Sequence, residues 1–499
     1  MQQIFYVTLD PEKALGVEDL IPSYHILYSE NSQLAIPIAD NGIDIHNFPK
    51  LNEVKLNSTS KMLENPSLIS YINDKSHKRP DILVFKNDDQ IVKECSNNNF
   101  KLLNPSPNLN KRLENKIEFT NFVKNIELFK QPEYELFEKV SDLNFSTLSS
   151  RFGVNFVIQF IFGHSGSSTF FIQSEEELND LKEKYPLRKG KVTRLILGPT
   201  YTVNACITKV GVIVGGISEQ ITGIPELTSS RGGTVGNDFS QRHLSESLRV
   251  EIISKTMEFG EFLRKEGHKG IFGLDFIIEE GTNEIYLIEA NIRQVASCSY
   301  VSYLQRLNKK VPIMLWHILE LLDFDFEKPF VSLNEEDDDW INTEITNFRL
   351  SNDKVNYNVN ANLPINASQI FFRNIKDHEI QILDQFPSGI YRIRGRTPEE
   401  SSLLENGQSY IAVYRLREDG WSTLCLEKRG YNIIQAKELG GFIINCVPEK
   451  TNVDILGEIG RIQVLESAFG SKDDKYPSGW IMDVVKCVYE NIRVIKSIG

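Results

Sequence analysis

Residues 270–293 have the sequence GIFGLDFIIEEGTNEIYLIEANIR, and this stretch decides the fold. Two apolar runs flank a polar segment, so the pattern predicts two antiparallel strands joined by a turn near Gly281–Thr282. With the turn at that position, Asp275 on the first strand lies opposite Glu289 on the second, within one register step. We therefore expect two carboxylates to meet on one face of a hairpin.

The second strand adds two further polar groups to that face. Side chains alternate along a strand, so Asn291 and Arg293 point the same way as Glu289. Carboxylates about 5 Å apart among apolar residues repel each other and lose hydration, so either one is protonated or a cation lies between them. An Asp, a Glu and an Asn carbonyl suit Mg2+ or Mn2+ rather than zinc, and an arginine beside them suits a phosphate or a developing oxyanion. The alternative is that Asp275 and Glu289 lie at strand ends, face solvent and share no face.

The composition limits the class of protein. A chain of 499 residues is too long for one core and predicts roughly two to four packed units. The formal net charge of −13 argues against a nucleic-acid backbone or an anionic membrane as the main partner, because both need a basic surface. The first residues show no basic segment followed by an apolar one, and no apolar run is long enough to span a bilayer. We expect a cytoplasmic protein.

The cysteines and two of the histidines are expected to play no chemical role. The cysteines are scattered without metal-ligand spacing, which favours small buried hydrophobic residues in a reducing compartment. His164, in a Gly/Ser-rich segment, and His268, just before the hairpin, are expected at surface turns. The cysteines are Cys95, Cys206, Cys298, Cys425, Cys446 and Cys487.

The first half of the chain alternates strands and helices. Residues 1–110 predict an α/β unit of modest size. Helical character follows over Lys111–Leu128, and Phe156–Phe162 predicts a buried strand that enters a Gly/Ser turn. The expected N-terminal strands are Ile4–Leu9, Tyr24–Tyr28, Leu34–Ile38 and Asp81–Phe85.

The middle of the chain is expected to carry strands, a long loop and helices. Lys191–Ile221 is β-rich, and Thr222–Phe239 is rich in Gly, Ser and Thr and predicts a long loop. Ser245 caps the next helix and Gly267 ends it. A second helix is expected near Val311–Leu322.

Residues 340–499 predict a separate β-rich unit. The acidic run Glu335–Asp339 before it indicates a linker or a solvated face, and a short amphipathic helix is expected at Trp480–Ile492. We expect a small antiparallel sheet or barrel. Either its loops reach the active site or the unit forms a homodimer interface, and the residues do not decide between these two roles. The expected strands are Gly389–Ile393, Tyr410–Tyr414, Ser422–Leu426 and Gly441–Val447.

On these residues the sequence resembles the ATP-grasp superfamily. The hairpin looks like its metal-binding signature, closest in style to D-alanine–D-alanine ligases, and Glu289–Arg293 is similar to the E-x-N-x-R run of biotin carboxylases. The resemblance covers roughly residues 80–325 and implies an α/β (α+β) ATP-grasp fold. The implied units are an N-terminal α/β pre-ATP-grasp domain (1–110), an ATP-grasp domain (111–330, with a nucleotide lid at 111–190 and a metal and catalytic part at 191–330) and the β-rich domain (340–499).

The resemblance also implies a nucleotide site. Lys116 takes the place of the family's first nucleotide lysine, and the loop with Gly166, Ser167 and Ser168 that of the segment closing over the triphosphate. Backbone groups of Arg194, Leu195 and Ile196 are expected to grip adenine. Three positions depart from the family: Gln159 replaces its second nucleotide lysine, and Thr193 and Thr200 replace acidic residues near the adenine and the ribose.

The activity implied is that of an ATP-dependent carboxylate–amine ligase using ATP with Mg2+ or Mn2+. Lys116, the 165–168 loop and Arg293 would spread the charge of phosphoryl transfer. The loop 222–239 would exclude water, and Arg231 within it either binds a substrate carboxylate or is solvated. The expected partners are small carboxylates and amines, including amino acids or peptides. The alternatives are a degenerate nucleotide-binding or regulatory protein, an enzyme with a thiol acceptor or a kinase, and an interaction protein that functions through residues 340–499.

Overall fold

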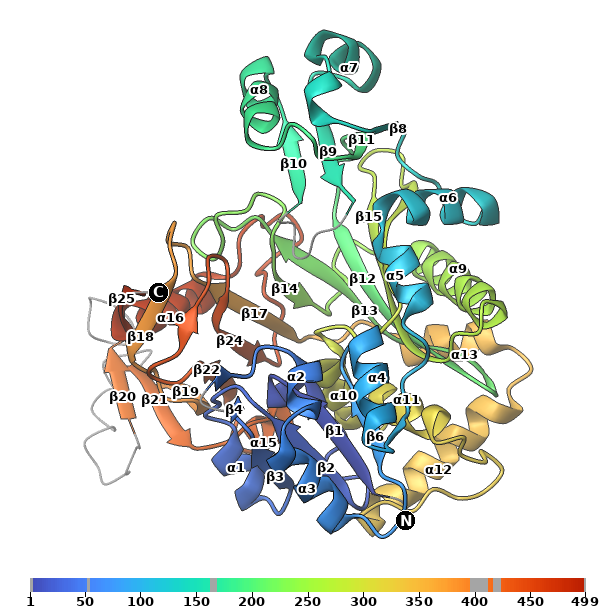
Figure 1. The fold of residues 1–499 in the computed structure, drawn as a ribbon, viewed down its shortest axis with the longest axis vertical. Helices are drawn as coiled ribbons and strands as arrows, with labels where there is room; N and C mark the ends of the chain where they lie inside the picture. Colours follow the sequence, from blue (N-terminus) through green and yellow to red (C-terminus); the bar gives the residue numbers. More distant parts are fainter. Residues whose placement is uncertain (1–2, 52–53, 162–167, 395–411, 416–422, 498–499) are drawn as a thin grey trace.

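The N-terminal part of the chain forms a five-stranded parallel sheet in the computed structural model, which describes residues 3–51, 54–161, 168–394, 412–415 and 423–497. The strand order is β3-β2-β1-β6-β7 (blue in Figure 1). Strands β1, β2 and β6 are buried along their whole length, as is typical of parallel strands covered on both faces. The strands are β1 (Ile4–Thr8), β2 (Tyr24–Tyr28), β3 (Asp44–Asn47), β6 (Asp81–Val84) and β7 (Lys101–Leu102).

Short helices connect these strands. They are η1 (Pro11–Ala14), α1 (Ala35–Asp40), α2 (Thr59–Leu63), α3 (Pro66–Lys75) and α4 (Asp89–Asn97), and a two-stranded hairpin of β4 (Lys50–Leu51) and β5 (Val54–Lys55) precedes α2. The strand expected at Leu34–Ile38 is wrong, because this segment forms the start of α1. Leu34 and Ile38 are four residues apart and buried, whereas Ile36 is exposed, so the burial follows a helical period.

A small four-stranded antiparallel sheet projects from the molecule (teal, top of Figure 1). Its order is β10-β9-β11-β8, and its own apolar core lies under η2, α7 and α8. Its elements are β8 (Tyr134–Phe137), η2 (Val140–Asp142), α7 (Phe145–Phe152), β9 (Phe156–Phe160), β10 (Thr169–Ile172), α8 (Glu175–Lys184) and β11 (Gly190–Arg194). The helix expected over Lys111–Leu128 leads into this sheet as two helices, α5 (Asn108–Glu114) and α6 (Lys116–Ile126), because Asn115 ends one and caps the other.

The largest sheet has eleven antiparallel strands in the order β16-β15-β12-β13-β14-β17-β24-β22-β19-β21-β20. Its first part contains β12 (Thr200–Thr208), β13 (Gly211–Thr222), β14 (Thr234–Asp238), β15 (Gly270–Ile278) and β16 (Ile285–Asn291). Its second part contains β17 (Ser368–Arg373), β19 (Gly389–Arg394), β20 (Ala412–Arg415), β21 (Thr423–Lys428), β22 (Phe442–Cys446) and β24 (Glu458–Val464). Helix α9 (Glu246–Lys265) lies between β14 and β15. The helices between the two parts are α10 (Cys298–Leu307), α11 (Ile313–Leu321), α12 (Glu335–Leu350) and α13 (Lys354–Ala361).

Strand β14 corrects two expectations. The long loop expected over Thr222–Phe239 is shorter, because Thr234–Asp238 pairs with β13 on one side and with β17 on the other. Most strands after residue 340, including those at the positions of the four expected strands, therefore continue the central sheet instead of forming a small sheet or barrel of their own. A separate three-stranded sheet contains β18 (Ile380–Asp384), β23 (Asn452–Val453) and β25 (Arg493–Lys496), and α15 (Ile433–Glu438) and α16 (Gly479–Asn491) complete this part.

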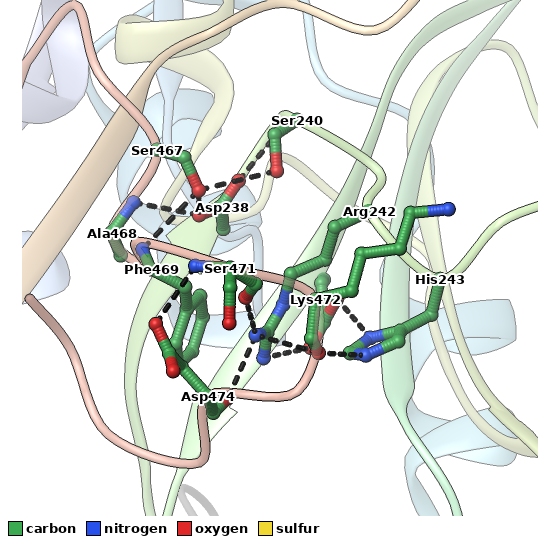
Figure 2. A network of polar contacts seen from close by, with 11 residues as sticks. Asp238, Ser240, Arg242, His243, Ser467, Ala468, Phe469, Ser471, Lys472 and Asp474 are labelled. Atoms are coloured by element: carbon green, nitrogen blue, oxygen red, sulfur yellow. Dashed lines mark hydrogen bonds and ion pairs between the residues drawn. The ribbon is translucent and has the colours of Figure 1, made fainter.

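Polar contacts fasten the loop 465–478 to the central sheet (Figure 2). Asp238, at the end of β14, accepts hydrogen bonds of 2.6 Å from the Ser467 hydroxyl and 2.7 Å from the Ala468 N–H. Arg242 pairs with Glu219 on β13 at 3.0 Å, and its guanidinium lies 3.4 Å from the ring centroid of Phe469. Arg242 also donates to the backbone carbonyls of Ser471, Lys472 and Asp474. These contacts fix the loop 465–478 against the end of β14 and the residues that follow it.

The helix predictions hold at most places. Ser245 caps α9 by accepting a hydrogen bond from the Leu248 N–H, and Gly267 follows the helix with a φ of 86°. The acidic run Glu335–Asp339 is not a linker, because it forms the start of α12. Negative side chains in the first turn of a helix interact favourably with the helix dipole. All six cysteines are buried, as expected. Among the described residues, no helix has the length and apolarity needed to cross a membrane.

Candidate functional site

The predicted hairpin is formed by β15 and β16, and its register places Asp275 directly opposite Glu289. On the other edge of β15, Thr202 of β12 lies opposite Asp275 and donates a 2.7 Å hydrogen bond from its hydroxyl to Asp275 Oδ1. Gln220 Nε2 donates in turn to the Thr202 hydroxyl at 2.6 Å. Opposed residues of an antiparallel pair share a face, so the sheet itself holds both carboxylates toward the same side.

The carboxyl group of Asp275 resists ionisation. Burial and the neighbouring charge of Glu289 raise the pKa of Asp275 to about 7, although Thr202, Lys116 and Arg293 act in the opposite direction. Two carboxylates on one face show this behaviour where no cation separates them. The pair has the electrostatics of a cation site.

Lys116 reaches this pair from the first turn of α6. Its Nζ lies 3.1 Å from Glu289 Oε2, and its side chain is 6% exposed. The N-cap Asn115 accepts hydrogen bonds from the N–H groups of Ile117 and Glu118, and the N–H of Lys116 donates to the Ile161 carbonyl at 3.0 Å. These backbone contacts fix the start of α6 between the small sheet and the central sheet, so that Lys116 reaches Glu289 on β16.

Arg293 lies at the end of the hairpin. Its guanidinium donates to Asn291 Oδ1 at 3.0 Å and to the Gln294 carbonyl at 2.9 Å. Arg293 Nε lies 3.5 Å from Glu114 Oε1, and the guanidinium carbon lies 5.5 Å from the ring centroid of Phe85, which follows β6. The arginine therefore joins the hairpin to the parallel sheet.

A cavity of about 670 Å³ opens at this point. The N-terminal part contributes Lys13 and Phe85 to its wall, and α6 contributes Phe119. Most of the other lining residues come from the small sheet, the central sheet and the segments that connect their strands. The structure brings together there most residues that the sequence singled out: Gln159, Thr193, Arg194, Leu195, Ile196, Thr200, Arg231, Asp275, Glu289, Asn291 and Arg293.

The connection from β11 to β12 offers backbone groups to this cavity. The guanidinium of Arg194 is engaged with the hairpin, at 2.6 Å from Glu279 and 3.2 Å from the Tyr286 hydroxyl. The N–H groups of Leu195 and Ile196 have no hydrogen-bond partner within the described part of the chain. Thr200 starts β12 beside them.

The expected phosphate loop lies largely outside the described residues. His164, Gly166 and Ser167 fall within the segment 162–167, which the structure does not describe. Ser168 is buried just before β10, and its carbonyl accepts a 3.0 Å hydrogen bond from the Phe160 N–H.

Arg231 is exposed, lines the cavity and connects a loop of the central sheet to the small sheet. It comes from the loop between β13 and β14, and its guanidinium lies 5.1 Å from the ring centroid of Phe171 on β10. With the amide oxygen of Gln173 turned toward it, Arg231 Nη1 donates at 2.7 Å. Both contacts tie the loop to the small sheet.

Lys191 is a cavity residue that the sequence reasoning missed. It lies on β11 opposite Gln159 of β9, lines the cavity and is 6% exposed. Burial and the charge of Lys116 lower the pKa of Lys191 to about 7, against the effect of Glu289. The period of two along β11 could have found it, because Thr193 was expected to face the nucleotide and Lys191 shares that face.

A second cavity of about 780 Å³ lies along the carboxyl edge of the parallel sheet, against β22 and β24. Lys13 lines both cavities, so they meet at this residue. The inner wall carries five charged side chains. They are the carboxylates of Asp10, Glu12 and Glu458 and the cations of Lys13 and Arg461.

His268 corrects a further expectation. It is buried, and its Nε2 lies 3.1 Å from the Ile271 carbonyl, so it is not on a surface turn. Burial lowers the pKa of His268 to about 4. In the described ranges no group of three or more His, Cys, Asp or Glu side chains could hold a metal ion; the Asp275–Glu289 pair has two such residues with Asn291 beside them.

Comparison with known proteins places this geometry in a known fold. No family model and no curated protein matches the sequence. Among solved structures, the biotin carboxylase domain of the Hydrogenobacter thermophilus 2-oxoglutarate carboxylase, in complex with MgADP, ADP and bicarbonate, aligns with a TM-score of 0.55 at 11% identity, over 99% of this chain and 91% of that one.

Two further structures align over almost the whole of both chains. N5-carboxyaminoimidazole synthetase from Staphylococcus aureus aligns with a TM-score of 0.52 at 10% identity, over 98% of each chain. The synthase from Aspergillus clavatus, in complex with ADP and 5-aminoimidazole ribonucleotide, aligns with a TM-score of 0.50 at 12% identity, over 97% of this chain and 99% of that one. The parallel N-terminal sheet, the small sheet and the central antiparallel sheet of this chain thus form an ATP-grasp fold.

Proposed function

We propose that this chain is an ATP-dependent ligase that activates a carboxylate as an acyl phosphate and joins it to an amine. The observation that carries the proposal is the opposition of Asp275 and Glu289 on one wall of the cavity, with Lys116, Asn291 and Arg293 around them. The fold supports ATP-dependent carboxylate activation in general, and the structures it resembles include complexes with ADP and MgADP.

The residues at the hairpin fit a divalent cation. Asp275, Glu289 and Asn291 would hold Mg2+ or Mn2+ through oxygen, and a cation between the carboxylates would offset the burial and the repulsion that raise the pKa of Asp275. Bound there, the metal would neutralise charge on the phosphates of ATP.

The opposite end of the cavity fits a nucleoside. The N–H groups of Leu195 and Ile196 can donate hydrogen bonds to the edge of an adenine ring. These backbone contacts do not need the acidic side chains that other members of the superfamily carry at the positions of Thr193 and Thr200. The small sheet forms the other wall, with Gln159 of β9 facing the cavity.

In the proposed reaction a carboxylate oxygen attacks the γ-phosphorus of ATP, ADP leaves and an acyl phosphate forms. An amine then attacks the acyl carbon, phosphate leaves, and the nitrogen gives up a proton to form the amide. Lys116 and Arg293 are placed to spread the negative charge of the transferring group, so positioning and electrostatics do the catalytic work. Arg231 is placed at the cavity rim, where it can bind a substrate carboxylate.

The second cavity supports an amine as the acceptor. Its inner wall has three carboxylates and two cations, so it carries one excess negative charge that a substrate ammonium would balance. The net charge at its rim is zero, because the exposed Lys50 and Lys450 balance the exposed Glu30 and Asp454. An amine bound there can reach the first cavity where the two meet, at Lys13.

Glu289→Gln tests this proposal. The substitution removes the charge shared by Lys116 and a metal, so ADP formation should fall by about a hundredfold or more, whereas the unfolding temperature should stay within a few degrees. Glu284→Gln on the same hairpin is the matched control, because the Glu284 side chain is 41% exposed and pairs with Lys130. ADP release and product mass are measured across a panel of carboxylates and amines.

The outcomes separate the candidate functions. Wild-type turnover in Glu289→Gln would contradict the role of the hairpin. A wild-type chain that binds MgATP and turns over no pair of the panel would favour a nucleotide-binding protein without ligase activity. A thioester in the product mixture would move the acceptor to a thiol.

A further inference from the structure

One row of polar side chains crosses three strands of the small sheet. Thr169 on β10 pairs with Gln159 on β9, which pairs with Lys191 on β11, and all three line the first cavity. Directly opposed residues share a face and have Cβ atoms about 5 Å apart. Gln159 is neutral and donates to the Thr169 hydroxyl at 3.4 Å, so Lys191 is the cation of this row.

Lys191 is buried without a counterion. Its ammonium lies 3.5 Å from the Thr120 hydroxyl and 5.9 Å from the ring centroid of Phe119, and no carboxylate of the described residues lies within ion-pair distance of it. The acidic group whose charge acts on it is Glu289, and that carboxylate is already paired with Lys116 at 3.1 Å. The protein therefore leaves the ammonium at the cavity wall without an anion.

A buried ammonium without an anion is costly, and the lowered pKa of Lys191, about 7, expresses that cost. A ligand that brings negative charge to the cavity would remove this energetic cost. A lysine that merely fills space in the small sheet would need no such ligand, and its amine could stay neutral against Thr120. The two roles differ in how the affinity for phosphate groups depends on this side chain.

We propose that Lys191 is a phosphate-binding residue of the nucleotide site and supplies from β11 the positive charge that Gln159 does not supply from β9. The inference rests on the proposed nucleotide-binding function and adds a residue to it. The positive charge at the phosphates comes from two neighbouring elements, Lys116 on α6 and Lys191 on β11; Glu289 pairs with Lys116, and its charge also acts on Lys191.

The first test measures binding of MgADP and of adenosine to the full chain by isothermal titration calorimetry. Lys191→Met should weaken MgADP about ten- to hundredfold, as expected for loss of a charge-assisted hydrogen bond, and leave adenosine within about threefold. Lys189→Met is the matched control, because Lys189 lies two residues away, is 42% exposed and pairs with Glu138. Unchanged MgADP affinity in Lys191→Met, or equal weakening of adenosine, would overturn the inference.

The second test moves the charge across the register pair. In the double variant Gln159→Lys/Lys191→Gln the lysine lies on β9 and the amide on β11, so the sheet keeps both groups on the same face. This variant should recover MgADP affinity to within about fivefold of the wild type, whereas Lys191→Gln alone should not. Failure of the exchange in a variant that still unfolds cooperatively at the wild-type temperature would count against a role through charge.

The two proposals fail in distinguishable ways. A wild-type chain that does not bind MgADP would contradict the proposed function itself. A wild-type chain that binds MgADP, with a Lys191→Met variant that binds it equally well, would contradict the assignment of Lys191 alone.

Discussion

Arg461 on β24 forms a buried ion pair with Glu12 in the turn after β1, with Arg461 Nη1 2.7 Å from Glu12 Oε1. The two residues are almost at opposite ends of the chain, and the pair joins the parallel sheet to the C-terminal part of the central sheet. Glu12 also accepts hydrogen bonds from Asn445 and Gln463, so the carboxylate is fully engaged. Burial raises the pKa of Glu12 more than Arg461 lowers it.

This pair predicts a large destabilisation when one partner is removed. Arg461→Met leaves Glu12 buried without its cation, and the free energy of unfolding should fall by about 3–5 kcal/mol. Chemical denaturation measures the change. The double variant Glu12→Gln/Arg461→Met should recover part of the loss, because the uncompensated charge is gone. If the double variant were less stable than Arg461→Met, the cost would come from packing rather than from the charge.

The Asp275–Glu289 pair predicts that metal binding depends on pH. Asp275 has a pKa of about 7, so below this value a metal must displace a proton, and the affinity should fall by about tenfold for each pH unit. Mn2+ binding, followed by electron paramagnetic resonance between pH 5.5 and 8.5, should rise with pH and level off above about 7. Asp275→Asn should weaken binding and abolish the slope. A slope that persists in this variant would assign the proton to another group.

The hairpin was predictable because the interactions that form it are local. Its strands are adjacent in the sequence, and the turn sets their register to within one step; the shift in register between Asp275 and Phe276 supplies that step and places Asp275 opposite Glu289. Helix α9 was predictable for the same reason, since its cap at Ser245 and its end near Gly267 lie within the segment itself. Local patterns decide structure where the partners are neighbours in the chain.

Other features depend on pairings between distant segments. Strand β14 is stabilised by β17, about 130 residues later along the chain, so Thr234–Asp238 looked like a loop by composition. The same pairing makes the C-terminal strands part of the central sheet, which no local pattern indicates. The alternation along β11 puts Lys191 on the face of Thr193, but its position opposite Gln159 follows from the register of β9 with β11, two strands separated by β10 and α8.

Two buried histidines predict a loss of stability in acid. Burial lowers the pKa of His268 to about 4 and that of His317 to about 3, below the value near 6.5 in the unfolded chain. Between these values the unfolded state binds protons that the folded state does not, so stability falls as pH decreases below about 6.5. The slope should be about 1.4 kcal/mol per pH unit for each histidine.

Denaturation of His317→Gln between pH 4.5 and 7.5 checks this prediction. The variant should lose stability at neutral pH, because His317 Nδ1 accepts a 3.0 Å hydrogen bond from the Ile271 N–H. Its dependence on pH should nevertheless be shallower than that of the wild type. An unchanged slope would show that other groups cause the sensitivity to acid.

If the second cavity binds the amine, Asp10 should affect KM for the amine and not for the other substrates. Asp10 Oδ1 accepts a 2.9 Å hydrogen bond from the Glu12 N–H, and Oδ2 lies 3.5 Å from Lys13 Nζ, at the junction of the two cavities. Asp10→Asn keeps the shape and the hydrogen-bond acceptor but removes the negative charge. If an ammonium binds beside it, KM for the amine should rise about tenfold, while KM for ATP and for the carboxylate should change by less than about threefold. Asp454→Asn at the exposed rim is the matched control. A change confined to KM for the carboxylate would instead assign this cavity to the acyl donor, because removal of Asp10 leaves the charge of Lys13 free to attract an anion.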